Sequence, residues 1–496
     1  MQRIRGGGLV AALAFAFSLS LATTSEAGAQ STTDGAIGGT VVDSAGAAVV
    51  NAHVSVRSNG TNTEQSVTTD ETGYYRVTKL QPGSYTVSAE VAGFAPFKAE
   101  QVVVQVGSVT ELAVHLNVAS AGETVIVNEE VPQVNTTSAE FAPTVNQLEI
   151  SNLPINGGRW SDFALLTPSV VNDSNGFGLL SFRGISTLLN NNTVDGADNN
   201  QAFFSEERGR TRVGYSSAKA AVQEFQVNTS NYSAEYGRAA GAVVNTVTKS
   251  GTNQFHGEGY FYDRDNDWGA TNPFTKITTQ TSPGVFSSNV FKPVDVRKMG
   301  GYGVGGPILK DRLFFHFAFD DYNRNFPGTA VPTSPSAFFA SPEPDLTNYS
   351  TADSCATLNA NAFTSGPNAL PNGANVRTAT QGACTLFSNL GLATYAAAVT
   401  DYNNGLGGLL GELGTVPRVG KQTIFFPKID WVINQKNRAS FEVNRMRWAS
   451  PAGIQTQATN TFGVASFGND YVRDTWGIAK LYTFFTSSLS NEARFF

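Results

Sequence analysis

Apolar and polar side chains alternate past Phe255, and this alternation constrains the fold more than any other feature of the 496-residue chain. It is clearest in 313–323, where one set of alternate positions is apolar (Leu313, Phe315, Phe317, Phe319) and the other is mostly polar (His316, Ala318, Asp320). A β-strand directs successive side chains to opposite faces, so this segment predicts a strand with one apolar and one polar face. Segments 423–433 and 438–448 repeat the pattern.

The connections between the predicted strands alternate in length. We expect strands at 255–263, 297–308, 313–323, 423–433, 438–448 and 471–485, with a seventh begun at 491–496. Long connections (264–296, 326–420, 449–470) alternate with short ones near Leu309, Asn434 and Ser487. Membrane-spanning barrels have short turns on the periplasmic side and long outer loops. The pattern therefore predicts the first strands of an antiparallel transmembrane β-barrel over 255–496, starting on the periplasmic side.

Composition agrees with a sheet that has an apolar surface. Charged residues make up 15% of the chain, against roughly 25% in an average soluble domain, while Gly (49) and Phe (34) are abundant. The net charge of −7 argues against a nucleic-acid partner, whose phosphates call for a basic face. The four histidines are scattered without metal-ligand spacing, so we expect no metal, no cofactor and no catalytic residue.

The N-terminus has the pattern of a secretory signal peptide over 1–29. It has a basic start, an apolar run over 9–22 and small residues before Gln30. The run is shorter than the ~20 residues of a spanning helix, and no later stretch is longer, so no transmembrane helix is expected after cleavage. The cleavage site lacks a cysteine, which argues against a lipoprotein.

Residues 35–118 predict a small β-sandwich, because segments of period two are separated by turn residues. Its TDETGYY and LQPGSYTV runs resemble the carboxypeptidase-regulatory-like module, which is not catalytic. A zinc peptidase would need clustered His and Glu ligands with a general base, and this region has no such spacing.

Residues 144–249 predict a small α+β domain. Two short helices are expected at 148–153 and 159–166, ended by Pro154 and Pro168. Strands and tight turns are expected around 182–184, 192–196 and 222–227. The glycines of this region allow turns with positive φ and close packing of the backbone.

Two long motifs carry a family resemblance. FRGISTLLNNNTVDGADNN, at 182–200, and AVQEFQVNTSNYSAEYGRAAGAVVNTVTKSGTNQFHGEGYFY, at 221–262, resemble the end of the plug and the first barrel strand of a TonB-dependent outer-membrane receptor. The Oar-like group of these receptors carries the regulatory-like module in front. The resemblance implies a mainly β protein with a sandwich, an α+β plug over 144–249 and a barrel of roughly 22 strands. About seven strands are visible, so we expect a truncated chain.

The plug motif comprises Phe182, Arg183, Gly184, Asp195 and Gly196. Arg183 can bind a carboxylate with planar geometry, and Asp195 is its candidate partner. We favour pairing within the plug, or between plug and wall, over ligand contact. The acidic run 195–200 lacks the spacing of a calcium loop, and Asx turns explain it better.

The linker 119–143 contains an ETVIV run (Glu123, Thr124, Val125, Ile126, Val127). Beside a plug it resembles a TonB box, the extended segment that such receptors offer to a TonB-type energy-coupling protein of the inner membrane. Backbone hydrogen bonds to the partner's sheet edge would supply affinity. The alternative is that the run is the last strand of the sandwich; we favour the box.

The only two cysteines, Cys355 and Cys384, lie in one predicted outer loop. In an oxidising compartment they could close that loop as a disulfide, and the alternative is two unpaired thiols.

The resemblance implies a receptor in the bacterial outer membrane, with its N-terminal domain in the periplasm. It would contact outer-membrane lipid, bind an extracellular ligand (a glycan, peptide or metal chelate) and import it by energy-coupled plug movement. The alternative is a surface-binding, adhesion or export-associated barrel protein without import. A secreted hydrolase would need a nucleophile–base or metal constellation that the sequence does not present.

Overall fold

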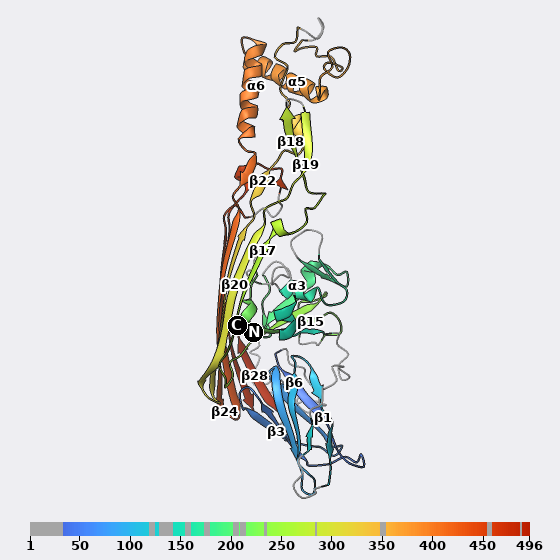
Figure 1. Ribbon diagram of the computed structural model, residues 1–496, viewed down its shortest axis with the longest axis vertical. Helices are drawn as coiled ribbons and strands as arrows, with labels where there is room; N and C mark the ends of the chain where they lie inside the picture. Colours follow the sequence, from blue (N-terminus) through green and yellow to red (C-terminus); the bar gives the residue numbers. More distant parts are fainter. Residues whose placement is uncertain are drawn as a thin grey trace, which may run out of the picture.

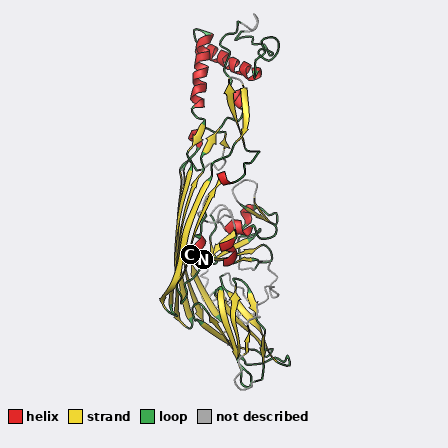
Figure 2. Cartoon of the chain, viewed as in Figure 1, coloured by secondary structure: helices red, strands yellow, loops and turns green. Residues whose placement is uncertain are grey.

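The computed structural model describes residues 33–118, 125–127, 142–153, 160–172, 179–201, 208, 215–232, 236–282, 285–347, 354–453, 459–486 and 489–496. Three bodies follow one another along an elongated molecule (Figure 1). A sandwich lies at one end, an α+β body, which we call the plug, lies against one face of a tall curved sheet, and long loops project beyond the other end. We call the tall sheet the wall. The architecture is mainly β, as predicted (Figure 2).

The sandwich consists of two small sheets with one apolar core between them. The first sheet has the order β4-β1-β7, with β8 also paired to β1, and the second has the order β3-β2-β5-β6-β9. Tyr75, Val87 and Val114 are among the buried residues where the sheets meet. The strands are β1 (Gly35–Asp43), β2 (His53–Ser58), β3 (Glu64–Thr68), β4 (Tyr74–Leu80), β5 (Gly83–Glu90), β6 (Phe97–Val104), β7 (Val109–Glu111), β8 (Val114–Leu116) and β9 (Val125–Val127).

The plug is built on a five-stranded sheet with the order β10-β15-β16-β13-β14, beside a separate β11–β12 pair. Its first helix begins at a capping box, in which Asn146 accepts from Leu148 N and Glu149 N while Glu149 accepts from Asn146 N. The elements are β10 (Thr144–Val145), α2 (Gln147–Asn152), α3 (Trp160–Ala164), β11 (Val170–Asn172), β12 (Leu180–Phe182), η1 (Thr187–Leu189), β13 (Asn191–Val194), β14 (Ala197–Asp198), η2 (Lys219–Ala221), β15 (Val222–Asn228) and β16 (Val243–Thr248).

The wall is one antiparallel sheet of seven strands with the order β17-β20-β21-β24-β25-β27-β28. Every predicted strand is present, and the short connections fall at 310–312, 435–436 and 485–489. Each strand pairs with the next one along the sheet, and β17 and β28 form its two open edges. The strands are β17 (His256–Asp265), β20 (Val296–Leu309), β21 (Leu313–Asn325), β24 (Val419–Asn434), β25 (Asn437–Ser450), β27 (Asp470–Phe484) and β28 (Ser490–Phe495).

The two faces of the wall differ as the alternation predicts. Along β24 the outward side chains are exposed, including Phe425 (37%), Ile429 (41%) and Trp431 (50%). The inward set is buried and turns from apolar to charged along the strand, from Ile424 and Phe426 to Lys428 and Asp430. The outer half of the inward face therefore carries an apolar band, where polar side chains were expected.

This difference has a physical cause. The inward apolar side chains, among them Met446 and Trp476, form one buried cluster with plug residues such as Tyr215 and Ala220. The plug, rather than water, covers this part of the wall. Apolar side chains at these positions are therefore removed from water in the folded protein.

The outer connections have structure of their own. Helices α5 and α6 form an arm at the far end of the molecule, above the β18–β19 hairpin (Figure 1). The sulfur atoms of Cys355 and Cys384 form a disulfide that joins the loop to α5. The elements are η3 (Asn266–Trp268), β18 (Lys276–Ser282), β19 (Val285–Val290), β22 (Gly328–Ala330), α4 (Pro335–Phe338), α5 (Gly373–Leu390), α6 (Tyr395–Leu410), β23 (Gly414–Val416), β26 (Thr459–Asn460) and η4 (Val464–Ser466).

In the described part of the chain, no single helix has both the length and the apolar character to cross a membrane. Only α5 and α6 taken together, with a bend of 112° between them, reach those limits by length and composition.

The outward face of β21 gives a direct test of the wall. Replacing Phe317 by Arg puts a guanidinium on the apolar face, which we expect to destabilise the folded barrel by about 2–4 kcal/mol if the position lies near the bilayer midplane. The measurement is the urea midpoint of the complete protein in lipid vesicles. The control is Phe274→Arg, because Phe274 is 90% exposed in an outer loop. Equal midpoints for the two variants would contradict the assignment of this face to lipid.

Candidate functional site

The plug meets the wall through the tip of the β13–β14 hairpin. Asp195 and Gly196 form its two-residue turn, with φ values of 46° and 72°. Asp-Gly is a preferred pair for such a turn, because Gly has no Cβ and Asp tolerates the left-handed region. The sequence VDGA thus builds a tight hairpin with a carboxylate at its end.

The carboxylate of Asp195 lies among two ammonium groups and a second carboxylate. Its Oδ2 is 3.2 Å from Nζ of Lys428 and 3.2 Å from Nζ of Lys480. Lys428 Nζ is also 3.5 Å from Oε2 of Glu442. Lys428, Glu442 and Lys480 come from the three neighbouring strands β24, β25 and β27, so one plug residue connects three strands of the wall.

Thr248, at the end of β16, completes this cluster. Its backbone N–H donates to Asp195 Oδ1 at 2.9 Å and its hydroxyl donates to Asp195 Oδ2 at 2.6 Å. Lys428 Nζ donates to the same hydroxyl oxygen at 2.7 Å. We call Asp195, Thr248, Lys428, Glu442 and Lys480 the plug–wall cluster.

The plug–wall cluster is buried and contains two acidic and two basic side chains, with the buried Asp430 of β24 nearby. Its four charged side chains are at most 6% exposed, and two carboxylates face two ammonium groups. Burial by itself raises the pKa of Asp195, but the attraction of Lys428 and Lys480 holds that pKa well below its usual value. Removing one partner from such a set leaves an uncompensated buried charge, which is strongly destabilising.

Other inward side chains of the wall bind the backbone of plug segment 215–221. Gln422 Nε2 donates to Tyr215 O at 2.6 Å, and Asn444 Nδ2 donates to Ser216 O at 3.1 Å. His316 Nε2 lies 3.1 Å from Ala220 O. Polar side chains of the wall thus bind backbone carbonyl oxygens of a plug segment that lies mostly outside the strands, in place of water.

A second contact joins the plug to the sandwich. Glu224 of β15 is 4% exposed and accepts a hydrogen bond of 2.6 Å from Val106 N in the β6–β7 loop. Gln226 Nε2 donates to Val106 O at 3.1 Å, so both backbone groups of one residue are bound. Burial raises the pKa of Glu224 to about 7, although the Val106 N–H opposes this.

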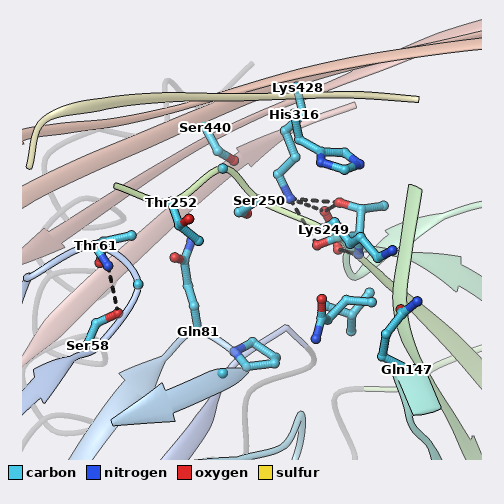
Figure 3. Close-up of a pocket in the computed structure, with 18 of the residues that line it drawn as sticks. Ser58, Thr61, Gln81, Gln147, Lys249, Ser250, Thr252, His316, Lys428 and Ser440 are labelled. Atoms are coloured by element: carbon cyan, nitrogen blue, oxygen red, sulfur yellow. Dashed lines mark hydrogen bonds and ion pairs between the residues drawn. The ribbon is translucent and has the colours of Figure 1, made fainter. Parts of the chain in front are cut away.

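A cavity of about 510 Å³, with many polar residues in its lining, lies where the three bodies meet. Figure 3 shows His316, Lys428 and Ser440 of the wall on one side and Ser58, Thr61 and Gln81 of the sandwich on the other. Lys249, Ser250 and Thr252 lie between them, and Gln147 of the plug lies to one side. We call this space the inner chamber, because it lies at the short-turn end of the wall.

The structure separates Arg183 from the partner predicted for it. Arg183 (φ 54°) and Gly184 (φ 76°) form an exposed turn after β12, while the ring of Phe182 is buried in a plug core with Val227 and Leu180. Asp195 pairs with wall lysines, so the prediction of an Arg183–Asp195 pair is wrong. The reason is that the two residues belong to different sheets of the plug.

The run Glu123–Val127 is described only in its last part. Val125–Val127 forms strand β9, parallel to β6, with Phe97 opposite Val125 and Ala99 opposite Val127. Glu123 and Thr124 lie outside the described residues. This placement matches the alternative given for the run, an edge strand of the sandwich, and the TonB box stays a prediction.

Sequence reasoning missed the wall members of the cluster. Lys428, Glu442 and Lys480 all stand at inward positions of their strands, and β24–β25 pairing places Lys428 directly opposite Glu442. Pairing the two predicted strands outward from the short turn near Asn434 would have placed Lys428 opposite Glu442. No signal in the chain identifies Thr248 as their neighbour.

Comparisons with known proteins define the class. Residues 36–117 match the carboxypeptidase regulatory-like domain, and residues 247–496 match the outer membrane beta barrel domain. The second match covers half of the chain, and the chain therefore belongs to the outer-membrane β-barrel family. Its location is the bacterial outer membrane.

One relative is more specific. Over 266 residues the chain is 29% identical to the TonB-dependent transporter Oar of Myxococcus xanthus. The aligned region covers 52% of this chain and 24% of Oar. The chain thus spans about a quarter of the length of that relative. The resemblance noted in the sequence to TonB-dependent receptors of the Oar-like group is confirmed by this homology and by the two domain matches.

Solved structures show lower similarity. The outer membrane transporter YddB from Escherichia coli has 12% identity and a TM-score of 0.39, over 69% of this chain and 36% of YddB. The ferric enterobactin receptor PfeA from Pseudomonas aeruginosa has 14% identity and a TM-score of 0.37, over 70% of this chain and 39% of PfeA.

Removing the carboxylate of Asp195 tests the plug–wall cluster. In Asp195→Asn the two buried ammonium groups lose the carboxylate that both of them contact, and we expect plug–wall packing to weaken by about 3–5 kcal/mol. Hydrogen exchange of the β16 amides in the complete protein measures this loss.

The control is Asp198→Asn in the same hairpin. The side chain of Asp198 is 43% exposed and pairs with Arg238, which is 60% exposed, so we expect less than about 1 kcal/mol. Equal protection of β16 in the two variants would show that Asp195 does not hold the plug.

The raised pKa of Glu224 makes sandwich–plug docking depend on pH. The usual pKa of this group is 4.5 and its docked value is about 7, so docking is strongest below 4.5 and weakens as pH rises through 7. The full effect is on the order of 3 kcal/mol. Undocking in urea can be measured by the distance between spin labels at positions 71 and 148. The urea concentration at the midpoint of undocking should be lower at pH 8 than at pH 5. Glu224→Gln should abolish this fall, and an unchanged fall in that variant would contradict the assignment.

Proposed function

We propose that the protein is a TonB-dependent receptor that binds a solute outside the cell and imports it when an inner-membrane partner displaces the plug. The observation that carries the proposal is a folded plug held against the inward face of an outer-membrane wall. Homology to a TonB-dependent transporter over half of the chain supports it. The mechanism is mechanical, and we assign no bond-forming or bond-breaking role to any residue.

The contacts between plug and wall suit a plug that must move and return. They include one buried charge cluster, single hydrogen bonds to segment 215–221 and an apolar cluster. The plug also keeps small cores of its own, around Phe163 and Phe182. A pulling force could therefore break plug–wall contacts before it unfolds the whole plug.

The pulled segment in this proposal is Glu123–Val127. Strand β9 lies at the edge of its sheet, next to β6, so it has a second side on which another strand can pair. A TonB-type protein would take the segment by β-augmentation. The extracellular ligand would be a glycan, a peptide or a metal chelate, bound by the plug apex and the outer loops.

The second candidate function is surface binding, adhesion or export without import. The long connection between β21 and β24 favours it, because it carries the disulfide and the projecting arm of α5 and α6. Such a protein would need no coupling segment.

Deleting 123–127 from the complete protein separates the two functions. A panel of fluorescent glycans, peptides and ferric chelates is first screened for binding to cells that express the protein. We expect the deletion to abolish uptake of the bound probe and to leave surface binding unchanged.

Deleting 133–137 from the same linker is the length control, and it should leave uptake at the level of the unmodified protein. Unchanged uptake after loss of 123–127 would refute the coupling assignment. A probe that is bound but never taken up, even by the unmodified protein, would favour the second function.

A further inference from the structure

The sandwich is bound to the rim of the wall as well as to the plug. Asn62 Nδ2 donates to Asp311 Oδ1 at 2.8 Å, in the turn between β20 and β21. Lys79 Nζ lies 3.3 Å from Glu492 Oε2 of β28, and Arg438 Nη2 of β25 donates to Lys79 O at 3.1 Å. These contacts reach across the wall from its second strand to its last.

The segment between plug and wall is part of the same contact. Asn253 N donates to Gly60 O of the sandwich at 2.8 Å. Asn253 Nδ2 donates to Asp311 Oδ1 at 2.7 Å, and Asp311 N donates to Asn253 Oδ1 at 2.8 Å. The β2–β3 turn of the sandwich, the start of the wall and its first short turn are therefore tied together at one point.

The inner chamber lies behind this contact. Residues of the sandwich (Ser58, Thr61, Gln81, Tyr85) line it on one side, and residues of the plug and wall line other parts of this partly open space. Its volume of about 510 Å³ falls in the range of small-molecule sites, and hydroxyl, amide and ammonium groups line it. A solute that leaves past a displaced plug would enter this space, which the sandwich lines on the side away from the wall.

We propose that the sandwich is a second, inner gate, which must separate from the wall rim before a polar solute can leave the inner chamber. The proposal rests on the import function proposed above. It gives the regulatory-like module a mechanical function of its own.

The contacts are suited to opening. The rim contacts named above are hydrogen bonds and one ion pair between partly exposed groups, which are individually weak. A further contact, 3.2 Å between the hydroxyl oxygens of Thr33 and Tyr482, is buried. The core of the sandwich is separate from that of the wall, so the module can leave the rim without unfolding. Val106 is bound to plug residues Glu224 and Gln226, so plug movement would pull the sandwich with it.

A disulfide across the rim contact tests the gate. A Cβ added at Gly60 would lie 3.6 Å from Cβ of Thr252, which is the separation found in disulfides. The double variant Gly60→Cys, Thr252→Cys therefore locks the sandwich to the rim when oxidised and releases it when reduced. Controls are both single variants, the unmodified protein with reductant, and a pair confined to the sandwich, Ser55→Cys with Ser66→Cys.

The first readout needs no solute. Ser440→Cys, which faces the inner chamber, is added to each variant, and the purified complete protein is treated with a bulky water-soluble maleimide. Peptide mapping gives the labelling rate at position 440. We expect at least a tenfold lower rate with the lock oxidised than reduced, and no change in the sandwich-confined pair. Equal rates would overturn the proposal.

The second readout is uptake of the fluorescent probe found to bind the cells. Oxidation of the lock should abolish uptake, leave surface binding intact and be reversed by reductant. Uptake by the oxidised lock at the rate of the unmodified protein would overturn the gate. If the unmodified protein takes up no probe, the import function fails, and the labelling rates still decide whether the sandwich closes the chamber.

Discussion

The structure depends on one constraint, which is that a backbone inside hydrocarbon must satisfy its own polar groups. Between its two open edges, β17 and β28, the wall meets it with an antiparallel sheet in which each strand bonds to the next. A sheet of this kind sorts side chains into two sets. The outward set can be apolar over most of a strand, as on β24 from Phe425 to Ile433, whereas the inward set must be covered by something that bonds to it. The plug provides that cover, and its position follows from the sorting.

The inward face combines two kinds of contact at different heights. Nearer the outer loops, Ile424, Met446 and Trp476 pack against small plug residues in an apolar cluster. Nearer the short turns, Lys428, Glu442 and Lys480 surround Asp195. The apolar cluster supplies non-directional attraction, and the charges accept only one position of the hairpin tip. The two kinds of contact together hold the plug in one position on the wall, while the plug keeps apolar cores of its own.

How far the sequence predicts the structure depends on the range of each interaction. The seven strands were predicted to within a few residues, because a period of two can be read directly from neighbouring residues such as Phe315 and Phe317. The helices α5 and α6, inside the connection read as one loop, and strand β3 were not predicted. The partners of Asp195 were also missed, because Lys428 and Lys480 lie more than two hundred residues away and meet it only through strand register and plug packing. The apolar band on the inward face was unexpected for the same reason, since plug coverage is not visible in any single strand.

The most direct test of the account is a cysteine scan of β21, from 313 to 325, in the complete protein in lipid bilayers. A nitroxide at each position reports its accessibility to oxygen, which concentrates in hydrocarbon, and to a water-soluble nickel complex. The account predicts oxygen accessibility that rises and falls with a period of two, high at 315, 317 and 319 and low at 316, 318 and 320. Low oxygen accessibility at every position, with the phenylalanines packed inside a water-soluble body, would contradict it.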